Sequence, residues 1–176
     1  MRQLAVGEGW GKGGVKGVAL GSVEASITAS LAHQIDGIMT ATEVGFQMEE
    51  AGRGRVITEM GKYAPTMITQ TAYASQTTVK ERPEVVKRFL KGFFATVAYM
   101  RENREKTVDI SAKVFNRSRA VMDKAYDFEI KTMSPDGVFD PAGLEVLKNS
   151  FVELDILPTK PTDDQILTTK FVPAKP

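Results

Sequence analysis

Short apolar runs alternate with helical segments over residues 1–60, and this alternation constrains the fold more than any other feature of the sequence. The apolar runs lie at 15–20, 38–41 and 55–60. One helical segment follows Ser22, and a second spans residues 43–50. Strands that alternate with helices in this way are typical of parallel α/β units. We therefore expect a parallel α/β unit with a boundary near residues 58–66.

The rest of the chain is rich in helical patterns but contains one further predicted strand, at 66–76. The clearest helix begins near Pro83, a residue suited to a first helical turn. Its apolar stripe comprises Val86, Leu90, Phe93, Val97 and Met100, flanked by Phe89 and Phe94. Weaker helical patterns cover 107–114 and 118–132, and another helix opens at Asp140. One strand is too few for so many helices, which indicates that part of a sheet is missing.

Composition excludes several classes of function. The chain has 176 residues with 23 basic and 22 acidic side chains, so its net charge is +1. This balance gives no support to nucleic acid or a membrane surface as a partner. Because there is no Cys, thiolate metal sites, iron–sulfur clusters and cysteine nucleophiles are excluded. Residues 1–7 do not resemble a signal peptide, and no apolar run is long enough to span a bilayer.

Three features that resemble chemical motifs have simpler interpretations. Residues 9–14 match the glycine spacing of a dinucleotide fingerprint, but they precede a strand instead of following one, so we interpret them as a loop. His33 is the only histidine and has no partner typical of a zinc site or a hydrolase triad. Glu49 and Glu50 are adjacent, so their carboxylates point in different directions on a helix. We therefore expect no cofactor and no metal.

The loops that follow the first two predicted strands carry a better signal for binding. Gly21 and Ser22 follow the first strand and begin a helix, and Thr42 and Glu43 do so after the second. In open α/β sheets, ligands bind beyond the carboxyl ends of strands, where helix N-termini offer free N–H groups. Ser22 and Thr42 are expected first as N-caps and second as ligand contacts.

Several segments in this order resemble one family. The chain is similar to the second lobe of ABC-transporter solute-binding proteins, in the branch that binds nitrate, sulfonates, taurine and thiamine-pyrimidine precursors. The segments that carry the resemblance are VALGS at 18–22, QIDG at 34–37, Glu43, AGRG at 51–54, YAS at 73–75 and RPEVVKRFLKG at 82–92. Two positions depart from the family pattern: His33 precedes Gln34 in place of Gly, and Val44 follows Glu43 in place of Pro.

The resemblance implies a periplasmic-binding-protein-like fold of type II, a three-layer α/β/α architecture whose two lobes are incomplete here. Residues 1–60 would be a remnant of lobe two, and residues 61–176 would be the closing segment of lobe one with a C-terminal tail. The chain resembles only the C-terminal half of such a protein. Because a truncated sheet exposes an edge and an apolar face, we expect copies to associate, with exchange of elements between them.

The same resemblance implies a function in transport without catalysis. A small sulfonate-, nitrate-, taurine- or pyrimidine-like solute would bind in a cleft between lobes and pass to an ABC permease. The implied contacts are Gly21, Ser22, Thr42 and Glu43 on one side, and Thr69, Gln70 and Thr71 on the other. The family is periplasmic, whereas a chain that truly starts at Met1 would be cytoplasmic. Glu43 is a poor neighbour for a purely anionic solute, so amines and zwitterions remain open.

Two other functions compete with this prediction. Some relatives at the fold level synthesise the thiamine pyrimidine, but those enzymes carry a cysteine-rich motif, and this chain has no Cys. Alternatively, the chain is a non-catalytic interaction protein that forms dimers without any ligand. A response of the melting temperature to solutes separates solute binding from this alternative.

Overall fold

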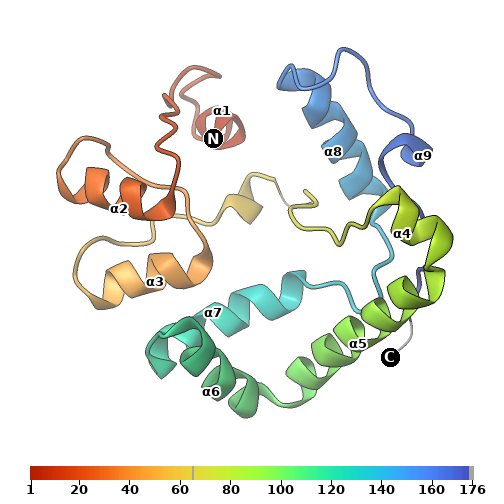
Figure 1. Cartoon of the computed structure of the whole chain (residues 1–176). Coiled ribbons are helices and arrows are strands. Elements are labelled where there is room, and N and C mark those ends of the chain that lie inside the picture. The colour runs from red at the N-terminus through yellow and green to blue at the C-terminus, as the bar shows by residue number, and fades with distance from the viewer. Residues whose placement is uncertain (65, 175–176) are drawn as a thin grey trace. The chain divides into compact units, whose positions relative to one another are not determined.

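The computed structural model describes residues 1–64 and 66–174, and its described elements are helices (Figure 1). They are α1 (Arg2–Gly7), α2 (Val23–Leu31), α3 (Thr42–Glu50), the 3₁₀ turn η1 (Met60–Lys62), α4 (Gln76–Glu81), α5 (Pro83–Glu102), α6 (Arg104–Phe115), α7 (Arg119–Thr132), α8 (Pro141–Glu153) and α9 (Asp163–Ile166). None of the described helices is long and apolar enough to cross a membrane.

The predicted three-layer α/β/α fold is wrong, because the described residues contain no strand and no sheet. The apolar runs at 15–20, 38–41, 55–60 and 66–76 are largely extended but form no ladder. Several of their apolar side chains stay in solvent, since Met39 is 65% exposed and Ile57 is 77% exposed. An extended segment becomes a strand only when a neighbour takes up its backbone N–H and C=O groups. These segments have the strand-like sequence without that neighbour.

The chain divides into two compact units, each built from two stretches of sequence. Unit 1 comprises Met1–Ala64 and Glu105–Lys131, and unit 2 comprises Pro65–Arg104 and Thr132–Pro176. The division into a lobe-two remnant at 1–60 and a lobe-one segment at 61–176 stays a prediction. In the structure, helices α6 and α7 pack with the N-terminal stretch.

The core of unit 1 is formed mainly by α6 and α7. Its buried residues are Val108, Val121, Met122 and Ala125, with Phe46 of α3 packed against them. The ring of Phe46 lies 5.5 Å from that of Phe128 of α7. A hydrogen bond adds to this contact: the hydroxyl of Ser118, which immediately precedes α7, donates to the carboxylate of Glu50 of α3 at 2.6 Å. Helix α3 is therefore held against α7 at several points along its length.

The core of unit 2 is organised by α5, whose first residue is Pro83 as the sequence predicts. Leu90, Phe94 and Val97 are buried on one face and pack against the C-terminal Phe171 and Ala174. The predicted stripe is therefore wrong at one position, because Phe93 is 49% exposed and Phe94 takes its place in the core. The C-terminal segment packs against the face centred on Phe94, and this contact selects which aromatic ring is buried.

Helix α8 of unit 2 has a capped N-terminus and a cluster of charged side chains. The carboxylate of Asp140 accepts from the backbone N–H groups of Ala142 and Gly143, at 3.1 and 3.2 Å. The ammonium of Lys148 is nearly buried and pairs with Asp163 of α9 at 2.7 Å and with Glu145 at 2.5 Å. A buried charge is stable only when it is paired in this way, so Lys148 fixes α9 on α8.

Candidate functional site

The start of α2 has the local geometry that the sequence predicts. Gly21 has a φ of +80°, which is in the left-handed region where glycine is favoured. Ser22 is the N-cap, and its hydroxyl oxygen accepts from the N–H of Ala25 at 3.1 Å. The N-cap role of Ser22 is confirmed, whereas its contact with a ligand stays a prediction.

A carboxylate already occupies the start of α2. Glu24 lies in the first turn, and its pKa is lowered by a hydrogen bond from its own backbone N–H and, to a smaller extent, by one from Ser22. This carboxylate takes up donors that a bound anion would need, and it adds a negative charge beside them. The N-terminus of α2 is thus a poor site for a bare anion.

The start of α3 differs from the prediction. The N-cap is Ala41, and Thr42 is the first residue inside the helix, so the predicted cap role of Thr42 is wrong. Its hydroxyl donates instead to the carboxylate of Glu129 of α7, at 2.6 Å. A hydroxyl forms a stronger hydrogen bond with an ionised carboxylate than with a backbone N–H group. Thr42 therefore links α3 to α7 instead of capping α3. Glu43 follows, partly buried, in the first turn.

The remaining predicted contacts lie in unit 2 and are exposed. Thr69, Gln70 and Thr71 belong to the extended segment that precedes α4 (Figure 1). Among the described residues, no hydrogen bond joins the start of α2 to the start of α3, and none holds these three side chains. Their role in binding stays a prediction.

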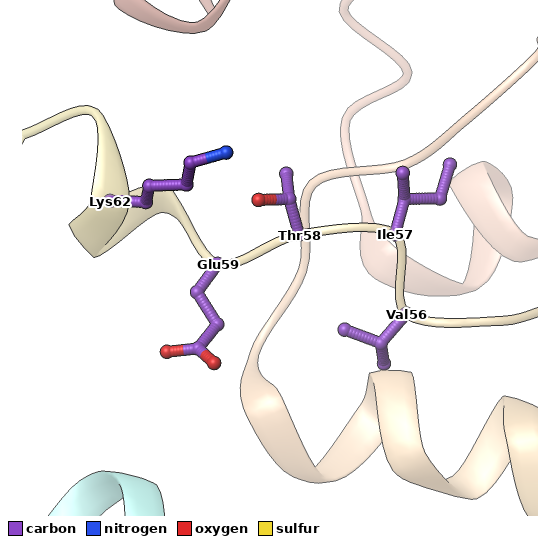
Figure 2. A pocket seen from close by; sticks show the side chains of 5 residues that line it. All are labelled: Val56, Ile57, Thr58, Glu59 and Lys62. Carbon is purple, nitrogen blue, oxygen red and sulfur yellow. The ribbon is translucent and has the colours of Figure 1, made fainter.

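A hollow that the sequence analysis did not identify lies in unit 1, beside α3. It has a volume of about 450 Å³ and is lined by Val56, Ile57, Thr58, Glu59 and Lys62. Figure 2 shows these side chains around the hollow, with Lys62 extending from η1 toward Thr58. The volume is within the range of small-molecule sites.

The segment that lines the hollow is attached to α3 by two contacts. The N–H of Val56 donates to the carboxylate of Glu49 at 2.7 Å. A Cβ at Gly45 would lie 3.2 Å from a methyl group of Val56, so the glycine lets the segment approach the helix closely. These contacts hold residues 55–59 extended along α3 without any strand partner.

The ammonium of Lys62 is positioned by two neighbours. Its Nζ lies 3.7 Å from the carboxylate of Glu8 and 5.1 Å from the centre of the Tyr63 ring. The hydroxyl of Tyr63 donates to the same carboxylate of Glu8. The lining of the hollow therefore includes an ammonium, a carboxylate and a hydroxyl together with two apolar side chains. Figure 2 shows Lys62, Thr58 and Ile57 on one side of the segment, and Glu59 and Val56 on the other.

The strand-end rule contained a signal for part of this site. Thr58 and Glu59 lie near the end of the third predicted strand at 55–60, whereas Ser22 and Thr42 follow the first and second. Applied to that third run, the rule places two polar side chains at a site. The rule does not identify Lys62, because the position of the Lys62 ammonium depends on Glu8, which is distant in sequence.

A second hollow of about 180 Å³ lies where α3 meets α7. Its lining includes Phe46, Glu50 and Lys124, and the ammonium of Lys124 lies 5.6 Å from the centre of the Phe46 ring. These groups already serve the packing of the two helices. No group of three or more metal-ligating side chains gathers in the part of the chain that the structure describes.

Comparison with known proteins gives one match. Residues 3–107 match the family described as NMT1/THI5 like, which is more than half of the chain. No curated protein and no solved structure matches the chain at a significant level. This family consists of solute-binding proteins that are generally not enzymes, so a broad solute-binding role is shown. The chain belongs to the NMT1/THI5-like family of solute-binding proteins.

Proposed function

We propose that this protein is the solute-binding component of an ABC importer, and that its solute is a small zwitterion such as a taurine-like aminosulfonate. The observation that carries the proposal is the hollow lined by opposite charges, Glu59 and Lys62, on the two sides of a segment that also carries Val56 and Ile57. An ammonium group would pair with Glu59, and a sulfonate with Lys62. The short carbon chain between them would pass from one side of the segment to the other, next to these apolar side chains.

The charges near the other candidate positions favour the same class of solute. Glu24 and Glu43 lie in the first turns of α2 and α3, and Glu59 lines the hollow. Each of these carboxylates would repel a bare anion such as nitrate bound beside it, because like charges disfavour each other at short range. A primary amine, as in taurine or an aminopyrimidine, removes that penalty. Among the solutes implied by the family resemblance, nitrate is therefore the least favoured.

The wider setting follows from family membership. We propose that the solute is captured outside the cytoplasmic membrane, in the periplasm, and is released to a membrane permease. Gly21, Ser22, Thr42 and Glu43, together with the exposed residues 69–71, remain proposed contacts. Association of copies of the chain also belongs to the proposal.

A thermal-shift and calorimetric titration tests the solute class. The panel is taurine, ethanesulfonate, ethylamine, nitrate and an aminopyrimidine. Taurine should raise the melting temperature, because a ligand that binds only the folded state stabilises it by mass action. Ethanesulfonate and ethylamine, which each keep one of its charges, should bind more weakly, and nitrate should have no effect.

Charge-removing variants locate the site. Lys62→Met and Glu59→Gln should each weaken taurine binding about fivefold, which corresponds to about 1 kcal/mol for an exposed ion pair. Lys12→Met is the matched control, because Lys12 is an exposed lysine that does not line the hollow. Equal affinity in Lys62→Met and Lys12→Met would remove the hollow from the proposal. A stronger response to nitrate than to taurine would contradict the proposed solute class.

A second candidate function is supported by the exposed apolar surface. Large hydrophobic side chains such as Ile57, Tyr73, Phe89 and Val114 are more than half exposed, and their burial between two copies would be favourable. In this alternative the chain forms dimers without any ligand. If no solute of the panel shifts the melting temperature while the chain associates, this alternative is favoured over solute transport.

A further inference from the structure

Residues 67–75 of unit 2 form an extended segment whose backbone is unpaired as far as residue 74, before Ser75 caps α4. Among the described residues, no backbone hydrogen bond involves residues 67–74. The segment is anchored at its start, where a Cβ on Gly143 of α8 would lie 2.5 Å from the carbonyl oxygen of Thr66. From Thr69 onward it is solvent-exposed, and Tyr73 is 96% exposed. The segment therefore presents a row of free donors and acceptors.

The sequence of this segment favours pairing and does nothing to prevent it. Residues 66–79 contain no charged residue, no proline and no glycine, and they are rich in Thr with Ile, Tyr and Val. Such residues favour strands. Natural proteins usually protect exposed strand edges with charges, prolines or bulges. Because residues 66–79 lack these protective features, we expect another strand to cover this edge.

The surface area of the chain supports association. A compact protein of 19.3 kDa exposes about 8,500 Å², whereas this chain exposes 12537 Å². Two separate compact units of half that mass would together expose about 10,200 Å². An excess of roughly 2,300 Å² thus remains even if the two units share no interface. A standard protein–protein interface covers about 800 Å² of each partner, so the excess is enough for one.

We infer that two copies of the chain associate by antiparallel pairing of residues 67–75 about a two-fold axis at Thr71. Pairing centred on Thr71 uses the whole segment, and it sets Thr69 of each copy opposite the partner's Tyr73. Threonine and aromatic side chains form favourable cross-strand pairs. A two-fold contact is self-complementary and closed, so it yields a dimer and not a fibre. The net charge of +1 leaves little repulsion between copies.

This pairing specifies the association proposed above and rests on it, but it does not depend on the solute. A two-stranded ribbon alone is marginal in water, so neighbouring apolar surface must be buried with it. The side chain of Met67, at one end of the segment, is 42% exposed and provides apolar surface of this kind. The exposed area calculated above is large enough to supply that contribution.

Single-cysteine variants test the inference without ambiguity, because the chain has no Cys of its own. The variants are Thr71→Cys, Thr69→Cys and Tyr73→Cys, and the matched control is Thr96→Cys, at an exposed threonine of α5 in the same unit. Far-UV circular dichroism verifies that each variant folds. Oxidised samples are then resolved on non-reducing gels.

Distance from the axis determines the expected pattern. Each residue adds about 3.3 Å on both strands, so the two copies of residue 69 are roughly 13 Å apart. A disulfide needs Cα atoms within about 7 Å. Thr71→Cys should therefore form at least ten times more cross-linked dimer than Thr69→Cys, Tyr73→Cys or Thr96→Cys. A mixture of Thr69→Cys with Tyr73→Cys should cross-link, although neither does so alone.

Several outcomes would overturn the inference. Equal cross-linking of the three segment variants would indicate parallel stacking or aggregation, and yields no higher than that of Thr96→Cys would exclude the segment. A chain that stays monomeric at 100 µM in sedimentation experiments would exclude association altogether. Loss of the taurine response with the cross-linking pattern intact would overturn the solute proposal alone, which keeps the two failures distinguishable.

Discussion

Replacement of Gly137 by Ala should destabilise unit 2, and the structure separates the two causes. Gly137 has a φ of +83°, a conformation that disfavours any residue with a Cβ by about 1–2 kcal/mol. A Cβ there would also lie 2.8 Å from the ring of Phe94 and 3.0 Å from a methyl group of Val172. Overpacking of this kind costs about 1–3 kcal/mol. The total expected loss in the free energy of unfolding is about 2–5 kcal/mol.

Urea denaturation followed by circular dichroism measures this loss. For a loss of about 3 kcal/mol, the midpoint should fall by about 1–3 M, since small proteins have m values of about 1–3 kcal/mol/M. Gly92→Ala is the matched control, because Gly92 lies inside α5 with open space around it. That substitution should stabilise the chain by up to about 1 kcal/mol, because alanine has the higher helix propensity.

A double-mutant cycle with Phe94→Leu isolates the steric part. In the Phe94→Leu background, the smaller side chain removes the contact with the ring, so the backbone strain of Gly137→Ala and its contact with Val172 should remain. The loss should then shrink to about 2 kcal/mol, the lower end of the range. If Gly137→Ala lowers the midpoint equally in both backgrounds, the contact with Phe94 contributes nothing. If it leaves the midpoint of the parent unchanged, both parts of the reasoning fail.

Three further predictions concern charge and capping. The pKa of Glu145 is lowered from 4.5 to about 2, chiefly by hydrogen bonds from Lys148 and then Lys160, so its stabilising effect exists above pH 4.5 and is lost as the pH falls toward 2. The difference in melting temperature between the parent and Glu145→Gln should therefore shrink over that range, and a constant difference would contradict it. Ser22→Ala should cost about 1 kcal/mol in urea unfolding, the usual effect of losing an N-cap, whereas Ser22→Asn should cost little. Thr42→Val should cost about 1 kcal/mol because it leaves an α7 carboxylate without its hydroxyl donor, while Thr42→Ser should retain most of the stability.

Local signals in the sequence predicted the helices well. Pro83 and Asp140 mark helix starts that the structure reproduces, and Ser22 caps α2 as expected. Each of these signals acts within one helical turn, so neighbouring residues contain the necessary information. Local pattern was insufficient where a distant segment decided the outcome. Phe94 is buried in place of Phe93 because the C-terminal residue Phe171 packs on that face.

The strands were mispredicted for a related reason. The run at 55–60 has the composition of a strand, yet its backbone is bound by the side chain of Glu49 and not by another strand. Strand propensity describes how well a segment fits a sheet, and it does not provide the sheet. The prediction recognised a shortage of strands in the second half of the chain, but the same shortage applies to the first half. Helices need no such partner, because their backbone hydrogen bonds are internal.

The candidate site shows the same division between local and distant information. The strand-end rule finds Ser22 and Thr42, which follow apolar runs, and, applied once more, Thr58 and Glu59 near the end of the third run. It does not reveal that the hydroxyl of Thr42 is already engaged by a carboxylate 87 residues away. Hydroxyls that serve the fold are less available to a ligand than charged groups that border an open hollow. For that reason Glu59 and Lys62 carry the functional proposal.

The exposed apolar surface and the unpaired extended segments have one physical origin. A strand-like sequence buries its side chains only when its backbone is also paired, because alternate side chains are brought to a covered face by the ladder itself. Ile57 in unit 1 and Tyr73 in unit 2 are exposed because their segments lack this pairing. Pairing of residues 67–75 between two copies would provide a ladder for the second segment. The extended run at 55–59 is held by α3 instead, and so its side chains are left free to line the hollow where we place the solute.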